Sequence, residues 1–312
     1  MLTDRFGRPI KNLRISLTDK CNLKCIYCHR EGEDRRGSYE LAIEDIKLIA
    51  EVSKHLEIDK VKLTGGEPLL RNDVVEIVKI FSELGFEDIS LTTNGVLIAD
   101  KALKLKNAGL KRVNISLPSF RRDRYVKITG LDLFVDVMMG IKEAINAKLH
   151  PVKINFVVLK DVNSDEINEA IDFADRNNVI LQLIELEPLG LAIDKYHNLY
   201  YPLNNIELEL LKKARNVIVR RDMNARRQFI VNNACIEIVR PMHNPEFCTY
   251  CTRIRITYDG KIKPCLMRSN NLVDLSKALR SKSKNDVIKA FRKAARLREP
   301  FFVGEGECFI SR

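Results

Sequence analysis

Three cysteines, Cys21, Cys25 and Cys28, lie within eight residues near the start of the 312-residue chain. Their C-x3-C-x2-C spacing puts three thiolates on one short loop, which suits an iron-sulfur cluster. Such clusters usually take four cysteine ligands, so a set of three leaves one iron with an open position that could bind a small molecule. Zinc, with His29 as a fourth ligand, and a disulfide are the alternatives.

A second set of three cysteines follows near the other end of the chain, at Cys248, Cys251 and Cys265. Arg253 and Arg255 come directly after Cys251, and alternation along a strand would place both guanidinium groups on one face. Arginine suits bidentate contacts with phosphate or with a nucleobase edge. A structural zinc completed by Cys235 or His243 is the serious alternative, but the arginines favour a substrate site.

A glycine pair, Gly65 and Gly66, precedes Glu67 at the end of a strand-like run. Glycines there let the backbone approach a ligand closely while its amides donate hydrogen bonds. Thr92 and Ser116 stand at the ends of the next two strand-like runs and offer hydroxyl groups. Turn chemistry is the alternative explanation, but the shared position favours ligand contact.

The elements that must position these residues alternate between strand-like and helix-like segments from residue 11 to about residue 185. We expect buried parallel strands at 13–17, 60–63, 89–92, 113–117, 152–159 and 180–184, and helices at 39–55, 73–84, 100–107, 133–147 and 165–176. These units predict an α/β fold, an incomplete (β/α)6 TIM-like barrel. Its chemistry should lie at the C-terminal ends of the strands, where the first cysteine set falls.

After residue 186 the pattern changes to a loop, a helix near 206–214 and short strands at 217–219, 229–231 and 236–239. These segments predict a smaller C-terminal α+β domain that carries the second cysteine set. The expected division is therefore residues 1–185 and residues 186–312.

The composition is that of a soluble globular chain, 45% hydrophobic and 30% charged, with a net charge of +11. No apolar run reaches the roughly 18 residues that span a bilayer, and the first residues lack the apolar core of a signal peptide, so we expect a cytoplasmic protein. A reducing cytosol favours metal binding over disulfides. A basic run between Lys277 and Arg298 could bind nucleic acid, but an amphipathic helix with a solvated basic face explains it better.

Together these motifs resemble those of radical S-adenosylmethionine (SAM) enzymes, in which an aromatic residue such as Tyr27 accompanies the C-x3-C-x2-C motif and a Thr-Gly-Gly-Glu-Pro segment follows. Within that superfamily the chain resembles the GTP 3',8-cyclase family of molybdenum cofactor biosynthesis. The similarity includes residues 4–8, 13–21 and 152–155. It also includes the Cys-x2-Cys-x-Arg-x-Arg arrangement of the second set with Cys265 after it, and it spans nearly the whole chain.

The resemblance implies two 4Fe-4S clusters and SAM as cofactors and GTP as substrate. The first cluster would bind SAM and reduce it to methionine and a 5'-deoxyadenosyl radical, while the second would bind GTP through its open iron. The radical would remove hydrogen from C3' of the ribose, and the carbon radical would then attack C8 of guanine. The product, 3',8-cyclo-7,8-dihydro-GTP, begins molybdopterin synthesis.

The resemblance also assigns residues and partners. The implied SAM contacts are Tyr27, Gly66, Ser116 and Glu187. The implied GTP contacts are Arg14, Lys62, Thr92, Lys153, Arg253, Ile254 and Arg255. The implied partners are an electron donor of the ferredoxin or flavodoxin type and the downstream cyclic pyranopterin monophosphate synthase. Neither a membrane nor nucleic acid is expected, and a homodimer is one candidate assembly.

The chain departs from the family pattern in three places. Gln182 and Glu187 stand where bacterial and eukaryotic members usually carry Arg and Met, and residues 308–312 differ from their Gly-Gly tail. These departures suggest an archaeal-type branch. Two other functions stay open: a peptide-modifying radical SAM maturase, which usually carries more C-terminal cysteines, and a zinc protein that binds nucleic acid.

Overall fold

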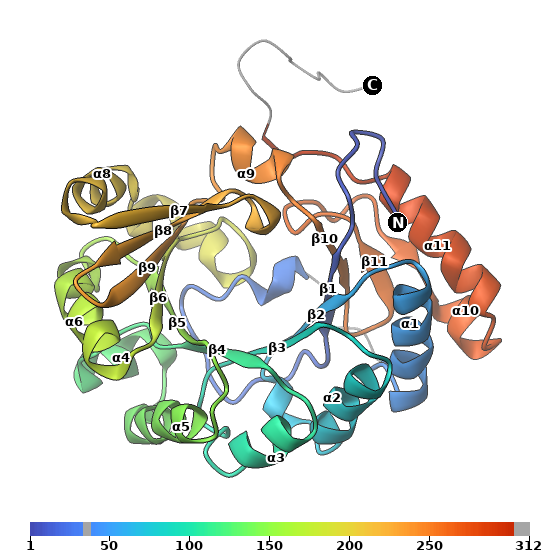
Figure 1. The fold of residues 1–312 in the computed structure, drawn as a ribbon, viewed down its shortest axis with the longest axis horizontal. Coiled ribbons are helices and arrows are strands. Elements are labelled where there is room, and N and C mark those ends of the chain that lie inside the picture. The colour runs from blue at the N-terminus through green and yellow to red at the C-terminus, as the bar shows by residue number, and fades with distance from the viewer. Residues whose placement is uncertain (34–38, 303–312) are drawn as a thin grey trace.

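The computed structural model describes residues 1–33 and 39–302, which form one twelve-stranded sheet curved around a central space (Figure 1). Six neighbouring strands pair in parallel: β1 (Asn12–Ser16), β2 (Lys60–Thr64), β3 (Asp88–Thr93), β4 (Arg112–Ser116), β5 (Val152–Val158) and β6 (Ile180–Glu185). All six predicted strands are confirmed, and with them the incomplete barrel.

Helices cover the outer face of these strands (Figure 1). They are α1 (Ile43–His55), α2 (Val74–Glu83), α3 (Ala102–Asn107), α4 (Arg122–Thr129), α5 (Phe134–Asn146) and α6 (Ile167–Asn177). The first begins at Ile43 rather than at residue 39, because the Asp45 carboxylate accepts a hydrogen bond from the Ala42 amide at 3.0 Å. Ser38, the expected cap, lies outside the described residues. The sequence analysis missed α4, whose many charged residues hide its apolar side.

The residues after β6 extend both edges of the same sheet. On one side β9 (Ala234–Val239) pairs in parallel with β6 and continues into β8 (Arg226–Val231) and β7 (Asn216–Arg220). On the other side β10 (Arg253–Ile256) pairs in parallel with β1 and continues into β11 (Lys261–Lys263) and β12 (Val273–Asp274). The remaining helices are α7 (Tyr196–Leu199), α8 (Asn204–Lys213), α9 (Pro245–Thr249), α10 (Ser276–Arg280) and α11 (Lys284–Arg296). The smaller α+β part therefore shares the barrel sheet, and the division at residues 185 and 186 stays a prediction.

Alternation along the strands separates an apolar layer from a polar interior. Leu13, Ile15 and Leu63 are almost fully buried in the core between sheet and helices. Arg14 and Lys62, which alternate with them, line a cavity inside the barrel instead. The sequence analysis expected buried strands, and the structure shows that the cavity-facing side of these strands carries many polar side chains beside apolar ones such as Val157 and Ile184. Within the described part of the chain, no helix combines the length and apolar character needed to cross a membrane.

The beginning and the end of the described chain meet at a buried ion cluster. The Asp4 carboxylate accepts from Arg8 Nε at 2.8 Å and from Arg298 Nη1 at 3.0 Å, and all three side chains are nearly inaccessible. Each arginine also donates to the second cysteine set: Arg8 Nη1 to the Cys248 carbonyl at 2.8 Å, and Arg298 Nη2 to the Cys251 carbonyl. The cluster therefore fixes the backbone that carries these cysteines.

We expect Asp4→Ala to lower the free energy of unfolding by about 3–5 kcal/mol, because it leaves two buried guanidinium groups without their counter-charge. Denaturant or thermal unfolding of the full chain measures this loss. Arg5→Gln is the matched control, because Arg5 pairs with Glu299 at an exposed position and should matter by less than about 0.5 kcal/mol. Equal losses in the two variants would contradict the importance of the cluster.

Candidate active site

A cavity of about 320 Å³ lies inside the barrel and gathers almost every residue singled out in the sequence. Both cysteine sets line it, as do Tyr27, Gly66, Ser116 and Glu187. The cationic and hydroxyl residues Arg14, Lys62, Thr92, Lys153, Arg253 and Arg255 line it as well. Ile254 does not, because it alternates with Arg253 and Arg255 in β10 and is fully buried in the apolar layer. The Ile254 side chain faces away from the cavity, and a contact of this residue with GTP stays a prediction.

The two cysteine sets lie at opposite ends of the barrel. The first follows β1, so it lies at the C-terminal ends of the strands, as the barrel rule predicts. The second lies at the other end, because Asn12, which opens β1, pairs in parallel with Arg253, which follows Cys251. Cys265 comes after β11, which runs antiparallel to β10 back toward Cys251. The sequence alone did not predict that the site extends through the barrel from one end to the other.

The thiols fit iron-sulfur clusters better than disulfides. None of the seven described cysteines forms a disulfide. In residues 1–33 and 39–302 no three His, Cys, Asp or Glu side chains converge as a single metal ion requires. A cubane cluster instead gives each thiolate its own iron, so three separated sulfurs on one loop suit it.

The surroundings of the two sets differ in charge. Burial raises the pKa of the first-set thiols, that of Cys25 to about 12, and neighbouring thiols add to the rise for Cys25 and Cys21. In the second set burial also acts to raise the pKa of Cys251, but the nearby cations Arg298 and Arg253 outweigh it and lower the pKa to about 7. Burial raises the pKa of Cys265, so within the second set the nearby arginines favour the thiolate form at Cys251.

Positive charge is crowded along the strands that face the cavity. Arg14 of β1 pairs with Lys62 of β2 on one side and with Arg255 of β10 on the other, so three cations lie side by side. Burial and the neighbouring cations lower the pKa of Lys62 well below its usual value, and the Lys62 ammonium bonds only the Asn114 amide oxygen, at 3.0 Å. Burial, followed by nearby cations, lowers the pKa of Arg253 to about 9. Among the described residues neither Lys62 nor Arg253 forms an ion pair.

Two buried carboxylates, which the sequence analysis missed, offset part of this charge. Glu31 accepts from Arg255 Nη1 at 2.7 Å and from Thr64 Oγ1 at 2.9 Å. Burial acts to raise the pKa of Glu31, but Arg14 and the other cations lower it to about 2. Glu31 therefore stays ionised and holds the loop after the first cysteine set against β10.

The second carboxylate, Glu237 of β9, is fully buried and accepts from Lys153 Nζ at 2.9 Å and from Arg220 Nη1 at 2.8 Å. Gln182 donates to the same carboxylate and accepts from Asn114 Nδ2 at 2.8 Å. Gln182, a departure from the family pattern, thus links β4, β6 and β9. A charged residue inside the apolar strand Ala-Cys-Ile-Glu-Ile-Val is the signal that could have revealed Glu237.

The glycine pair acts through close packing. The Gly66 amide donates to the Thr18 carbonyl at 2.7 Å, and a Cβ at Gly66 would lie 2.1 Å from the Lys20 carbonyl oxygen. The expected donation from this amide to a ligand is therefore wrong, since the amide is already used. Glu67 is fully buried and accepts from Thr93 Oγ1 and from the Asn94 amide, both at 2.7 Å. It joins the ends of β2 and β3.

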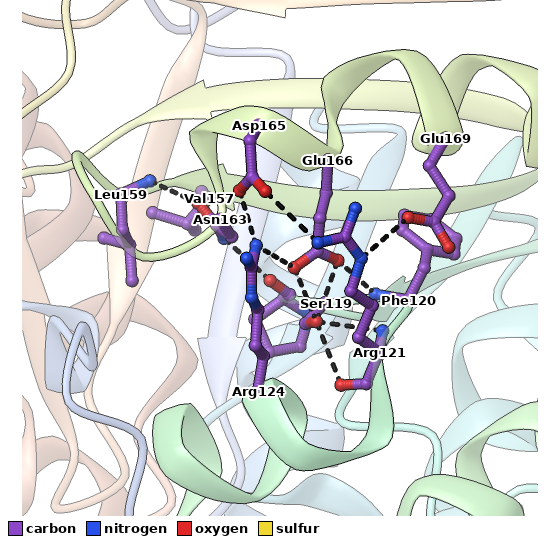
Figure 2. Close-up of polar contacts among 11 residues, drawn as sticks. Ser119, Phe120, Arg121, Arg124, Val157, Leu159, Asn163, Asp165, Glu166 and Glu169 are labelled. Carbon is purple, nitrogen blue, oxygen red and sulfur yellow. Dashed lines mark hydrogen bonds and ion pairs between the residues drawn. The ribbon is translucent and has the colours of Figure 1, made fainter.

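Thr92 and Ser116 have different surroundings. Thr92 Oγ1 is buried and has no hydrogen-bond partner among the described residues, so it is ready to bond a ligand in the cavity. Ser116 ends β4, and the residues that follow it are held by a buried network (Figure 2). The expected ligand contact stays a prediction for both hydroxyl groups.

Figure 2 shows how this network joins the loops after β4 and β5. Glu166 is fully buried, and its carboxylate accepts from Ser119 Oγ and the Phe120 amide, both at 2.8 Å, and from Arg124 Nη1 at 3.0 Å. Asn163 Nδ2 donates to the Pro118 carbonyl at 2.7 Å. The carboxylate is occupied by the loop, which explains why α6 begins after Glu166 and not at residue 165.

Known proteins match most of the described region. Residues 15–174 match the family model for the Radical SAM superfamily, and residues 179–302 match the model named Molybdenum Cofactor Synthesis C. A "Probable GTP 3',8-cyclase" from Methanocaldococcus jannaschii is 46% identical over 301 residues, 96% of this chain and 99% of that protein. A protein of the same name from Pyrococcus horikoshii is 46% identical over 308 residues, 97% and 98% of the two chains.

Solved structures share the fold. Streptococcus suis SuiB bound to S-adenosylmethionine superposes with a TM-score of 0.64 at 18% identity, covering 91% of this chain and 68% of that one. The structure titled native anSMEcpe with bound AdoMet gives a TM-score of 0.59 at 18% identity, covering 88% and 81%. At this identity the likeness shows a common architecture alone.

The Glu166 network generates a stability prediction. Glu166→Ala should lower the free energy of unfolding by about 2–4 kcal/mol, because it removes the acceptor of the Phe120 amide and leaves the Ser119 hydroxyl only its longer bond to the Arg121 carbonyl, at 3.1 Å. Glu169→Gln is the control on the same helix. Glu169 is about 40% exposed and pairs only with exposed Arg121, so a change below about 0.5 kcal/mol is expected. Thermal unfolding of both variants tests this. A similar loss of stability in each would show that the buried network stabilises the fold no more than the exposed ion pair does.

Proposed function

Because this chain belongs to the GTP 3',8-cyclase family of the radical SAM superfamily, we propose that it cyclises GTP in the cavity between its two cysteine sets. It is an enzyme of molybdenum cofactor biosynthesis, and its product is 3',8-cyclo-7,8-dihydro-GTP. The observation that supports GTP most directly is that Lys62 and Arg253 line the cavity among other cations and that neither pairs with a carboxylate of the described residues. Buried cations without counter-ions are costly, so an anionic substrate would complete this site.

The first cysteine set is proposed to hold a 4Fe-4S cluster, as the superfamily implies, and the second set a further one that faces GTP. When bound there, the cluster would pass one electron from the external electron donor to SAM, and the resulting 5'-deoxyadenosyl radical would be the group that takes hydrogen from the GTP ribose. The chain positions the reactants and encloses them, which keeps the radical from water and from other side chains.

Particular residues would then share the binding. Tyr27, Gly66, Ser116 and Glu187 line the cavity and are proposed to contact SAM. Arg14, Lys62, Thr92, Lys153, Arg253 and Arg255 are proposed to contact GTP. Thr92 Oγ1, which is buried without a partner in the described residues, supports this assignment. Lys153 is neutralised by Glu237, so we expect it to orient GTP rather than to supply free charge.

The proposal extends to the surroundings of the enzyme. We propose a cytoplasmic protein whose electron donor is of the ferredoxin or flavodoxin type and whose product passes to cyclic pyranopterin monophosphate synthase. Residues 1–185 would bind SAM, and residues 186–312 would contribute the further cluster.

The decisive experiment is anaerobic incubation of the reconstituted protein with SAM and GTP, with products identified by mass. We expect Cys21→Ala, Cys25→Ala or Cys28→Ala to abolish SAM cleavage, because each removes a ligand of the SAM-binding cluster. Cys248→Ala should leave some SAM cleavage but form no product from GTP. Cys235→Ala is the control, since Cys235 is a free cysteine in β9 outside both sets.

Iron and sulfide analysis accompanies this experiment. Two four-iron clusters per chain are expected, and about one zinc per cysteine set without acid-labile sulfide would contradict the proposal. SAM cleavage that persists in the first-set variants would show that the two sets are assigned to the wrong roles.

Arg253 generates a separate prediction about affinity. Arg253→Ala should weaken GTP binding about ten-fold or more, because a hydrogen bond from a charged group is worth about 1.5–3 kcal/mol. Arg253→Lys should recover only part of this loss, because an ammonium group cannot replace a planar fork. Titration of GTP against anaerobic, reconstituted protein measures both values, with iron content checked in each sample.

Arg122→Ala is the control for this titration, because Arg122 pairs with Asp132 on the exposed surface and does not line the cavity. Unchanged GTP affinity in Arg253→Ala would remove the reason to place the nucleotide beside the second cysteine set.

A further inference from the structure

Arg226 is a buried arginine in the cavity that no sequence motif singled out. It opens β8, only 8% of it is exposed, and it lines the same cavity as Lys62 and Arg253. Its charge lies close enough to Lys62 to contribute to the lowered pKa of that ammonium group. A strand from the far edge of the sheet therefore delivers another cation to the centre of the site.

The partners of Arg226 within the protein do not neutralise it. Arg226 Nε donates to the Met223 carbonyl at 2.9 Å, and Nη1 lies 3.5 Å from Glu237 Oε2. The same Glu237 carboxylate already has shorter contacts with Lys153 Nζ at 2.9 Å and with Arg220 Nη1 at 2.8 Å. One carboxylate thus serves three cations, and Arg226 has the longest contact of the three. The net charge around it is positive.

The backbone before Arg226 is held in an uncommon conformation. Asn224 and Ala225 are both left-handed, with φ of 65° and 51°, although neither is glycine. This conformation is unfavourable for most L-residues, least so for Asn, and it persists where surrounding contacts enforce it. Two contacts hold this turn in place. Asn224 Nδ2 donates to the Phe247 carbonyl at 2.8 Å, and the Asp222 carboxylate lies 3.5 Å from Lys60 Nζ.

These contacts carry the turn between β7 and β8 across the open side of the barrel. Thr252 Oγ1, next to Cys251, donates to the Asp222 carbonyl at 3.3 Å. Lys60 opens β2 on the opposite part of the sheet. In Figure 1 the β7–β8 hairpin points toward β10, in agreement with these bonds. The turn therefore closes the end of the cavity that holds the second cysteine set, and it leaves Arg226 pointing into that cavity.

We infer that Arg226 is a further substrate-binding residue, whose guanidinium group donates to the phosphate oxygens of the nucleotide. The inference rests on the proposed GTP function and adds a residue to its site. We place the phosphates of the nucleotide, and not its guanine base, beside Arg226, because a neutral base would leave the crowded cations without counter-charge. A guanidinium group also matches phosphate in a bidentate manner, which Lys62 cannot do.

The test compares two variants with a matched control. Arg226→Gln removes the charge at similar size, and Arg226→Lys keeps the charge but loses the fork. Arg220→Gln is the control, because Arg220 shares the Glu237 carboxylate at 2.8 Å but does not line the cavity. Each protein is reconstituted anaerobically, checked for iron content, and titrated with GTP and separately with inorganic tripolyphosphate.

We expect Arg226→Gln to bind both GTP and tripolyphosphate about ten-fold or more weakly, from the loss of charged hydrogen bonds. Arg226→Lys should fall between this variant and the wild type for both probes. Arg220→Gln should bind both probes within about two-fold of the wild type, which corresponds to a change well below 1.4 kcal/mol.

Several outcomes would overturn the inference. Unchanged tripolyphosphate affinity in Arg226→Gln would do so, and so would an equal loss in Arg220→Gln, which would show an indirect effect through Glu237. If Arg226→Gln fails to retain iron, Arg226→Lys decides, and wild-type affinity in that variant rejects the bidentate contact. A wild-type protein that binds tripolyphosphate but not GTP would contradict the proposed function while leaving the role of Arg226 in anion binding intact.

Discussion

Crowding of positive charge inside the incomplete barrel is the constraint on which the rest of this structure depends. Arg14, Lys62 and Arg255 occupy neighbouring positions on three parallel strands, and Arg253 lies on the same face as Arg255. Such charges repel one another strongly where water is scarce. Only Arg14 and Arg255 share a carboxylate, that of Glu31. An interior of this kind is stable only because the sheet holds its side chains in place and because an anion can complete it.

Buried carboxylates hold the segments around the cavity together, and each one joins segments that are distant in sequence. Glu31 links the loop of the first cysteine set to β10, and Glu237 links β5, β7 and β6. Glu67 joins the ends of β2 and β3, and Glu166 joins the loops after β4 and β5. These acids are structural: their oxygens are occupied by donors of the protein itself. The cations, the thiols and Thr92 line the cavity.

The second half of the chain completes the barrel from both edges, and this arrangement explains how two cysteine sets can serve one cavity. β10 brings Arg253 and Arg255 beside β1, while the turn before β8 crosses to the same end from the opposite edge. The first set stays at the C-terminal ends of the strands. A substrate between the sets would therefore contact residues from nearly every strand of the barrel, which suits a reaction that must exclude water.

The amino-acid sequence by itself determined the strands, most of the helices and the chemical identity of the site. Cysteine spacing, glycine pairs and apolar runs are local features, so the sequence shows them directly. The resemblance that they carry named site residues, and all of these except Ile254 line the cavity. The starts of α1 and α6 were less certain. The residues before them, Ala42 and Glu166, are held by hydrogen bonds that the sequence pattern does not show.

Tertiary structure alone decided which charges meet. Glu31, Glu237 and Arg226 carry no motif, and their roles follow from strand register, which pairs residues more than fifty positions apart, as when Gln182 meets Glu237. It also decided that the two cysteine sets face each other through the barrel, since that depends on the parallel pairing of β10 with β1. The physical reason is that electrostatic interaction depends on distance in space, and the folded sheet sets that distance while the order of residues along the chain does not.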